Sequence, residues 1–371
     1  MQGTYYIGMD CGSTTVKTVV INKDMQIIYK KYERHHSRVR ETALSQMSDV
    51  KRIVLPNARI HFALSGSAGL GLSGSSGLPF VQEVFATKKA CGVLIPGTDA
   101  VVELGGEDAK ILFLSGGNEE RMNGTCAGGT GAFIDQMAAL LSVTAPELDE
   151  LYFGHKQIYN IASRCGVFAK SDIQPLLNQG ASKEDIAASI YQAIVSQTIS
   201  GLAAGRELKG KIAFLGGPLT FGLGLRDRFV KTLKLDEEHA IFPDNAQYFV
   251  AMGTAMLAAE EEPLSMQEIA LALTKPSEAD FTNSLPPLFA NFEEYQEFKA
   301  RHEKDTVENA DIMTYSGKAY LGIDAGSTTT KLALITEDGK MLYSFYDANH
   351  GEPLDVIRLE LIKIYEQIGD R

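Results

Sequence analysis

The sequence lacks the features that would place it in a membrane or on a nucleic acid. None of its apolar runs approaches the roughly 20 residues that a helix needs to cross a bilayer, and it opens directly on a strand pattern without a signal peptide. The 371 residues carry a net charge of −12 and no run rich in lysine and arginine, which disfavours a surface for nucleic acid or anionic lipid. These absences predict a cytoplasmic protein with no membrane and no nucleic-acid partner.

Cysteine is also scarce, with four residues in the whole chain: Cys11, Cys91, Cys126 and Cys165. In a reducing compartment so few cysteines indicate buried thiols, ligands or redox groups, and not a disulfide framework. Neither a P-loop (GxxxxGK followed by Ser or Thr) nor a GxGxxG dinucleotide loop occurs in the right context. By contrast, the apolar content of 44% is ample for a large core, and the length suggests two or more domains.

One segment of the sequence occurs twice. Residues 6–17 read YIGMDCGSTTVK and residues 320–331 read YLGIDAGSTTTK, with eight of twelve positions identical and an offset of 314 residues. The same offset relates Tyr29 to Tyr343 and His36 to His350. The second copy therefore predicts the start of a second domain, and the chain is interpreted as the front part of a longer tandem protein.

Three parts follow from this repeat. We expect an ATPase domain over residues 1–261, a proline-rich linker or accessory segment over 262–318, and an incomplete second repeat over 319–371. An incomplete sheet exposes an edge, so the last part is expected to be disordered or docked on a neighbour.

Strand and helix patterns alternate along the first 261 residues, which predicts an α/β fold with largely covered sheets. Strands are expected within residues 4–34, at 61–69, 100–117 and 211–218. Helices are expected near 41–55 and at 79–97, 184–208 and 247–261, with a mainly helical region over about 121–205.

The repeated segment has the composition of a phosphate-binding hairpin. Between two strands, the turn residues offer backbone N–H and side-chain hydroxyl groups to phosphate oxygens; they are Gly12, Ser13, Thr14 and Thr15. Lys17 adds a cation, and Asp10 is placed to hold Mg²⁺ through water. An ordinary β-turn is the alternative interpretation for one copy alone.

Two further glycine turns strengthen the phosphate interpretation. The second hairpin contributes Glu103, Gly105, Gly106, Glu107, Asp108 and Lys110, and a later strand ends in Gly216, Gly217 and Pro218. This order resembles the superfamily of actin, heat-shock chaperones and sugar kinases, whose two lobes (ribonuclease H-like halves) close on ATP. The resemblance implies ATP/ADP and Mg²⁺ as cofactors, with the last turn beside the adenosine. Asp10 and Glu103 are both candidate catalytic residues for positioning the attacking water.

Two cysteines lie in glycine-rich segments. Cys126 is in NGTCAGGTGAF and Cys165 in SRCGVFAKSD, each before an expected helix. Spacing alone favours inert core thiols, but the neighbouring glycines leave room at the backbone. Two cysteines cannot fill the four thiolate positions of a cubane cluster, whereas two copies across a twofold axis can. Cys11 and Cys91 are interpreted as core residues, with Cys91 ending a helix before Gly92.

Together with DCGSTTVK and LGGEDAK, these cysteine motifs resemble the ATP-dependent activators of 2-hydroxyacyl-CoA dehydratases and the ATPase subunits of benzoyl-CoA reductases, over about residues 4–260. The resemblance implies an ATPase coupled to electron transfer. It implies a homodimer or pseudo-dimer in which one 4Fe-4S cluster is held by Cys126 and Cys165 of two subunits or domains. It also implies a dehydratase or reductase as partner and reduced ferredoxin or flavodoxin as electron donor.

The chain departs from this family at a few positions, and two other functions stay open. Glu103 and Glu107 stand where the family commonly has Asp and Gln, and Lys170 stands where an acidic residue is frequent. A small-molecule (sugar) kinase would need Asp135 or Asp172 as general base. An ATP-regulated scaffold without redox chemistry would need neither these acids nor the cysteines.

Overall fold

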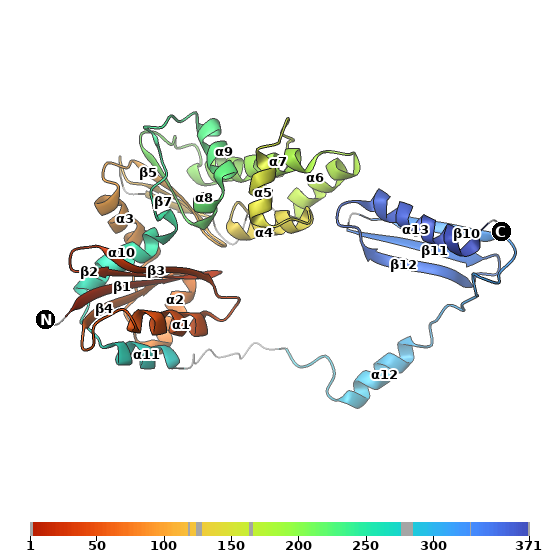
Figure 1. Ribbon diagram of the computed structural model, residues 1–371, viewed down its shortest axis with the longest axis horizontal. Helices are drawn as coiled ribbons and strands as arrows, with labels where there is room; N and C mark the ends of the chain where they lie inside the picture. Colours follow the sequence, from red (N-terminus) through yellow and green to blue (C-terminus); the bar gives the residue numbers. More distant parts are fainter. Residues whose placement is uncertain are drawn as a thin grey trace. The chain divides into compact units, whose positions relative to one another are not determined.

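The computed structural model describes residues 3–117, 119–123, 128–162, 166–275, 285–326 and 328–369 (Figure 1). The chain folds into two compact units. The first contains most of the chain up to residue 278, and the second contains residues 279–371 together with 140–142 and 173–181. None of the helices in these ranges is both long and apolar enough to span a bilayer.

The first lobe of the first unit is built on a four-stranded sheet of order β3-β2-β1-β4. Its strands are β1 (Thr4–Cys11), β2 (Thr15–Asn22), β3 (Ile27–Arg34) and β4 (Arg59–Ser65). One face packs on the helices α1 (Val39–Lys51), α2 (Ser67–Ser76) and α11 (Met266–Thr274) around Ile7, Met9 and Phe62. Because β1 and β2 are antiparallel neighbours, a tight turn suffices to join them.

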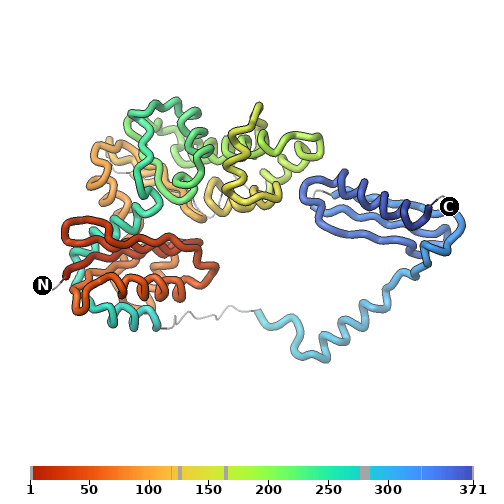
Figure 2. Tube along the Cα trace, in the orientation of Figure 1, coloured from red at the N-terminus to blue at the C-terminus, as the bar shows by residue number. Residues whose placement is uncertain are grey.

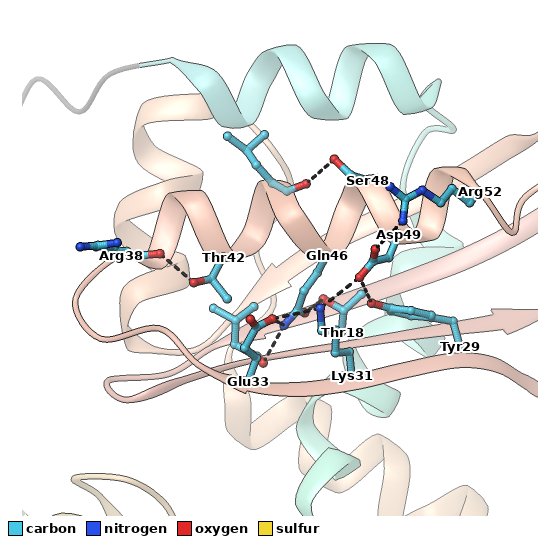
Figure 3. A network of polar contacts seen from close by, with 12 residues as sticks. Thr18, Tyr29, Lys31, Glu33, Arg38, Thr42, Gln46, Ser48, Asp49 and Arg52 are labelled. Carbon is cyan, nitrogen blue, oxygen red and sulfur yellow. Dashed lines mark hydrogen bonds and ion pairs between the residues drawn. The ribbon is translucent and has the colours of Figure 1, made fainter.

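Polar contacts fix helix α1 to this sheet (Figure 3). Thr18 Oγ1 on β2 donates to Gln46 Oε1 on α1 at 2.6 Å, and both residues are fully buried. Gln46 Nε2 donates in turn to the carbonyl of Val16 at 3.3 Å. Nearer the surface, Lys31 Nζ lies 3.0 Å from Asp49 Oδ2. The buried donors and acceptors are therefore paired, which orders the strands that carry the first hairpin.

The second lobe is built on a five-stranded sheet of order β7-β6-β5-β8-β9. Its strands are β5 (Ala100–Leu104), β6 (Ala109–Phe113), β7 (Glu119–Met122), β8 (Ile212–Leu215) and β9 (Ala240–Ile241). Strand β5 is antiparallel to β6 and parallel to β8, as β1 is to β2 and β4. Each lobe thus carries one tight hairpin at an equivalent place in its sheet.

Helices make up most of the rest of this unit. They are α3 (Glu83–Leu94), α4 (Gly131–Leu140), α5 (Ala145–Tyr152), α6 (Gly166–Asn178), α7 (Lys183–Gln197), α8 (Gly217–Phe221) and α9 (Leu223–Leu233), of which the end of α4 and the second half of α6 are counted with the second unit. Helices α5, α7 and α9 pack on one another. Asp149 of α5 accepts the first-turn N–H groups of α9, from Leu223 at 3.0 Å and Gly224 at 2.9 Å, so this cap fixes the start of α9.

Helix α10 (Phe249–Leu257) packs on both β1 and α3. Figure 2 shows this late segment beside the N-terminal strands. Two glycines permit the contact: a Cβ on Gly8 of β1 would lie 2.1 Å from the carbonyl oxygen of Ala251, and a Cβ on Gly253 would lie 1.8 Å from that of Ala86. Backbone therefore meets backbone on both sides of α10.

Two expected helices differ from those in the structure. The helix expected at 79–97 begins at Glu83, because Leu64 N donates to the Pro79 carbonyl and Val81 N to the Leu64 carbonyl, both at 2.8 Å. Helix α3 also continues past Gly92 to Leu94, so the interpretation of Cys91 as its end is wrong. A glycine inside a helix with open space around it lowers helix propensity without breaking the helix.

The helix expected at 184–208 has two parts. Helix α7 ends at Gln197 and the chain continues as a π-helix over Thr198–Ala203. It then leaves through Ala204 and Gly205, whose φ angles are +44° and +87°. Apolar spacing does not distinguish a π-helix from an α-helix over so few residues, which explains the difference.

The second unit contains helix α12 (Phe292–His302) and a three-stranded sheet of order β10-β11-β12. The remaining elements are β10 (Ala319–Ala325), β11 (Thr329–Thr336), β12 (Met341–Ala348) and α13 (Pro353–Ile368). Leu332, Leu334 and Leu342 of the sheet form a small core with Ile364 of α13. Of the two outcomes expected for residues 319–371, disorder is wrong for the described part, because α13 gives the three strands an apolar partner, and docking on a neighbour stays a prediction.

Candidate nucleotide site

The first hairpin holds a buried ion pair beside its turn. Gly12 N donates to the Thr15 carbonyl at 3.0 Å and closes the turn. The strand register places Asp10 opposite Lys17, and Lys17 Nζ lies 2.7 Å from Asp10 Oδ2. Burial disfavours charge on Lys17, but the Asp10 carboxylate outweighs it and raises the pKa of the Lys17 ammonium above its ordinary value. Lys17 is thus a permanent cation next to the turn.

The second hairpin touches the first. Gly105 N donates to the Asp108 carbonyl at 2.7 Å, which closes the turn between β5 and β6. A Cβ on Gly106 would lie 2.3 Å from Thr14 Oγ1. Any side chain at position 106 would push the two turns apart, so glycine is needed for their close approach.

Glu103 lies in an unusual electrostatic environment at the start of this hairpin. Thr87 Oγ1 donates to Glu103 Oε2 at 3.1 Å. Burial, followed by repulsion from the carboxylates of Asp108 and Asp10, raises the pKa of Glu103 to about 8. Without nucleotide, Glu103 is mostly protonated at neutral pH, and a nearby cation such as Mg²⁺ would favour its ionised form.

The other charged residues of the second hairpin differ in their exposure. Lys110 is 3% exposed; it pairs with Glu83 and lies 2.8 Å from Asp108. Glu107, at the tip of the turn, is exposed. Lys110 is therefore a buried cation held between α3 and the turn.

A cavity of about 510 Å³ lies at the two hairpins, a size typical of small-molecule sites. Of the residues predicted from the sequence, its lining includes Thr14, Thr15, Lys17, Glu103, Gly105, Gly106, Gly216, Gly217 and Pro218. The lining does not include Asp10, Gly12, Ser13, Glu107, Asp108 or Lys110. Three glycine turns that are distant in sequence thus face one cavity.

The third turn depends on two glycines for different reasons. Gly216 has φ +93°, and a Cβ there would lie 2.1 Å from the carbonyl oxygen of Leu104. A Cβ on Gly217 would lie 2.6 Å from the hydroxyl oxygen of Tyr32. The turn can therefore lie against β5 on one side and approach Tyr32 of the other lobe.

Sequence reasoning missed the aromatic part of the lining. Tyr32 of β3 and Phe221 of α8 meet edge to face with ring centroids 5.7 Å apart, and both line the cavity. Tyr32 has the pattern of an ordinary strand residue, so its type gave no signal. The repeat did contain a signal for Tyr32, because Tyr346 lies 314 residues after it, which is the offset of the other repeated residues.

Helix α4 is attached to the second hairpin by its first turn. Gly131 N donates to the Gly105 carbonyl at 3.0 Å, and Ala132 N to the Gly106 carbonyl at 2.7 Å. Arg34, at the end of β3, lies 2.9 Å from Asp135 of α4. The first turn of α4 is therefore bonded directly to the second hairpin, and α4 also has a contact with the first lobe.

Both carboxylates considered for a kinase mechanism are engaged. Asp135 pairs with Arg34, and Asp172 Oδ2 accepts the backbone N–H of Ala162 at 2.8 Å. Neither is held as a free base facing a substrate hydroxyl, so this geometry gives the kinase alternative no support.

Cys126 and Cys165 lie outside the residues that the structure describes. Over the described ranges, no group of three or more His, Cys, Asp and Glu residues could hold a metal ion. Cys11 and Cys91 are free and buried. Burial raises the pKa of the Cys91 thiol to about 12 and that of Cys11 further, so both behave as inert core thiols.

Comparison with known proteins places this geometry in a family. The sequence model of the BadF/BadG/BcrA/BcrD ATPase family matches residues 7–258. The 2-hydroxyisocaproyl-CoA dehydratase activator of Clostridioides difficile is 28% identical over 282 residues, which cover 71% of this chain and 98% of that protein.

Two solved structures share the fold. Component A of the (R)-2-hydroxyglutaryl-CoA dehydratase of Acidaminococcus fermentans matches with a TM-score of 0.62 and 26% identity, over 70% of this chain and 98% of its own. The activator of the 2-hydroxyisocaproyl-CoA dehydratase from Clostridium difficile, with bound ADPNP, matches with a TM-score of 0.59 and 27% identity. The match covers 69% of this chain and 95% of the activator. The predicted two-lobed, actin- and sugar-kinase-like α/β fold is confirmed.

Proposed function

The chain belongs to the BadF/BadG/BcrA/BcrD ATPase family, and we propose that it is an ATP-hydrolysing activator that transfers an electron to a partner enzyme. The partner is a 2-hydroxyacyl-CoA dehydratase or a benzoyl-CoA reductase, because proteins similar to this chain are named after these enzymes. Residues 1–261 form the ATPase domain of this proposal, residues 262–318 a linker, and residues 319–371 the start of a second repeat.

ATP binds in the cavity of the first unit. Thr14, Thr15 and Lys17 hold the terminal phosphates from one lobe, while Gly105 and Gly106 face them from the other. The adenosine lies by Gly216, Gly217 and Pro218. Gly12 and Ser13 complete the first turn, and Glu107, Asp108 and Lys110 shape the second. The support is that residues from all three turns line a single cavity.

Hydrolysis requires an acidic residue that orients water near Mg²⁺. Asp10 and Glu103 are the candidates, and their environments differ. Asp10 is paired with Lys17 at 2.7 Å, whereas Glu103 accepts from the neutral hydroxyl of Thr87 at 3.1 Å. Glu103 can therefore gain or lose a proton when the cation and nucleotide arrive, which is what a general base must do.

Cys126 and Cys165 hold one 4Fe-4S cluster together with the same residues of a second copy, or of a second domain. Such a cluster supplies one-electron chemistry. The electron comes from reduced ferredoxin or flavodoxin. Nucleotide binding can affect the cluster only through residues that lie between the cavity and the two cysteine segments.

One observation carries this proposal: the first turn of α4 donates to the carbonyls of Gly105 and Gly106, at 3.0 and 2.7 Å. Residue 126 lies only five positions before α4 begins at Gly131. Because the γ-phosphate of ATP meets the turn at 105–106, its arrival or loss moves α4 and with it the segment that contains Cys126. This is the hinge type of coupling, in which ligand binding drives a rotation.

The variant Ala132→Pro tests the coupling. It removes the N–H that donates to Gly106, while a proline is tolerated in the first turn of a helix. Helix α8 already has the same Gly-Pro order at its start, in Gly217 and Pro218. We expect the variant to bind ATP and to retain iron, but to lose the effect of ATP on the rate at which a chelator removes that iron.

Glu184→Pro is the matched control, because it places proline at the same position of α7, away from the hairpin. It should behave as the unaltered protein. An unchanged ATP effect in Ala132→Pro would show that the hairpin does not act through α4 and would contradict the proposed mechanism.

A further inference from the structure

A buried histidine lies beside the turn of the first hairpin. His35 follows the end of β3 and is 6% exposed. Its ring nitrogen Nε2 lies 3.2 Å from the Gly12 carbonyl oxygen, and its backbone N–H donates to the Thr14 carbonyl at 3.2 Å. The proposed function assigns no role to this histidine, although both contacts end on the turn that binds phosphate.

The hydrogen bonds of the His35 ring define its tautomer. Ser37 N donates to His35 Nδ1 at 3.1 Å. A backbone N–H can donate only to a nitrogen that has a free lone pair, so Nδ1 carries no proton and the proton of the neutral ring is on Nε2. The ring therefore accepts from Ser37 on one side and donates to the Gly12 carbonyl on the other.

The loop that supplies the Ser37 N–H has an unusual backbone. His36 and Ser37 have φ angles of +45° and +63°, a region that costs free energy for residues other than glycine. Arg38 N donates to the His35 carbonyl at 2.7 Å and closes this loop. The strained conformation is the one that brings the Ser37 N–H back to the His35 ring.

The second repeat contains the same arrangement with a different residue type. Asn349 lies 314 residues after His35. Its backbone N–H donates to the Thr328 carbonyl at 2.9 Å, and its Nδ2 donates to the Gly326 carbonyl at 2.8 Å. Gly351 N donates to Asn349 Oδ1 at 3.1 Å. Each of the three contacts of His35 thus has a counterpart at the repeat offset.

The two side chains have the same hydrogen-bonding capacity. An asparagine amide presents one acceptor and one donor group, and so does a histidine ring with its proton on Nε2. His350 and Gly351 also have positive φ angles, of +49° and +83°, as His36 and Ser37 do. What the two copies share is therefore the connection from a loop N–H through a side chain to the carbonyl of the turn glycine.

This connection fixes the direction of two peptide groups in the first turn. The C=O and N–H of a trans peptide unit point in opposite directions. Because His35 binds the carbonyls of Gly12 and Thr14, the N–H groups of Ser13 and Thr15 point away from it. Backbone N–H groups are the donors that such a turn offers to phosphate, so His35 fixes the orientation of two of them.

We propose that His35 is a positioning residue of the nucleotide site, which as the Nε2–H tautomer keeps the first turn in its phosphate-binding conformation. His35 is not among the residues that line the cavity, so it acts through Gly12 and not on the ligand. The inference rests on the proposed binding of ATP in this cavity, and adds to it the loop between β3 and α1.

Equilibrium binding of MgATP and of adenosine to the full chain tests this role. His35→Leu has no donor or acceptor, and we expect it to weaken MgATP binding about tenfold and to leave adenosine binding unchanged. His35→Asn should retain MgATP binding, as Asn349 makes the same contacts. His61→Leu is the control, because His61 Nδ1 also lies 2.8 Å from a carbonyl oxygen, that of Glu261, but away from the turn.

Two results of the binding measurements would overturn the inference. The first is MgATP binding that His35→Leu leaves unchanged. The second is an equal loss of MgATP binding in His35→Asn and His35→Leu, because a role in packing alone would not distinguish asparagine from leucine by their hydrogen bonds.

The tautomer can be measured without nucleotide. In two-bond ¹H–¹⁵N correlation spectra, the His35 signals are identified by their loss in His35→Asn, and they should show a protonated Nε2 and an unprotonated Nδ1. The opposite tautomer would overturn the role of His35 alone. An unaltered chain that binds no MgATP would instead contradict the proposed function, so the two failures are distinguishable.

Discussion

Glu103 combines burial with two acidic neighbours, and its protonation makes stability depend on pH. Its pKa is about 8 in the folded chain, raised from an ordinary value of 4.5. Between these values the folded state keeps a proton that the unfolded state has lost. The folded state therefore binds more protons, and the free energy of unfolding decreases as pH rises through this window.

Glu103→Gln should remove this pH dependence. For the nucleotide-free protein between about pH 5 and 8, a single proton contributes a slope of at most ~1.4 kcal/mol per pH unit. The measurement is urea unfolding across this range, compared with Glu293→Gln, which changes an exposed residue of α12. Equal slopes in the Glu103 variant and the unaltered chain would show that Glu103 is ionised throughout.

The two copies of the Asp–Lys pair allow a second test at the residue scale. Both pairs have an N–O distance of 2.7 Å, but one is buried and the other is largely exposed. Lys17→Met leaves Asp10 buried without a partner and should destabilise its unit by ~3–5 kcal/mol. Lys331→Met should cost much less, because solvent screens its exposed pair with Asp324. Hydrogen exchange of each hairpin measures the two effects separately, and comparable losses would contradict the burial argument.

Residue types on the hairpins could be predicted because glycine, threonine and lysine have a direct chemical reason to lie in a phosphate turn. The sequence did not allow the same prediction for three other residues of the site, Thr87, Tyr32 and Arg34. Each has an ordinary role in its own helix or strand, and its place at the site depends on which elements the fold brings together. Only the position of Tyr346 in the repeat gave a signal for Tyr32.

At the scale of elements, α10 is held between β1 and α3 by two glycine contacts. Gly253→Ala adds a methyl group that would lie 1.8 Å from the Ala86 carbonyl oxygen. We expect it to destabilise the first unit by ~1–3 kcal/mol, despite the better helix propensity of alanine. Gly92→Ala is the control, since Gly92 lies inside α3 and a Cβ added there would have no other atom within 4 Å beyond its own helix and chain neighbours. It should be neutral or stabilising by up to ~1 kcal/mol.

Thermal unfolding measures both glycine variants. A Gly253→Ala protein as stable as Gly92→Ala would mean that α10 can move away from α3 without cost. The existence of α10 was predictable from its apolar pattern. Its close contacts were not, because nothing in the sequence near Gly253 indicates that Ala86 lies against it.

At the scale of the whole first unit, the pair of Arg34 and Asp135 connects the lobes at the cavity. The side chains are 56% and 39% exposed, so the pair contributes little to stability. It should act on kinetics instead: Arg34→Met is expected to release bound ADP several-fold faster, with the free energy of unfolding changed by less than ~1 kcal/mol. Stopped-flow displacement of a fluorescent ADP analogue measures the rate, with Arg52→Met, at the end of α1, as control. An unchanged rate would show that the pair does not restrain the lobes.

The fold class and the three glycine turns could be predicted because strand alternation and turn chemistry are local. The assembly of one cavity from Lys17, Glu103 and Gly217 depends on long-range packing, which the sequence indicates only through resemblance to a family. The described residues likewise do not include Cys126 and Cys165, so their role as ligands stays a prediction.

The most direct test of that role is the iron and acid-labile sulfide content of the protein purified without oxygen. The account predicts about four iron and four sulfide per shared cluster, lost in Cys126→Ala and in Cys165→Ala but kept in Cys91→Ala. Protein that is folded and binds ATP yet contains no iron, or that keeps its iron after both replacements, would contradict the account.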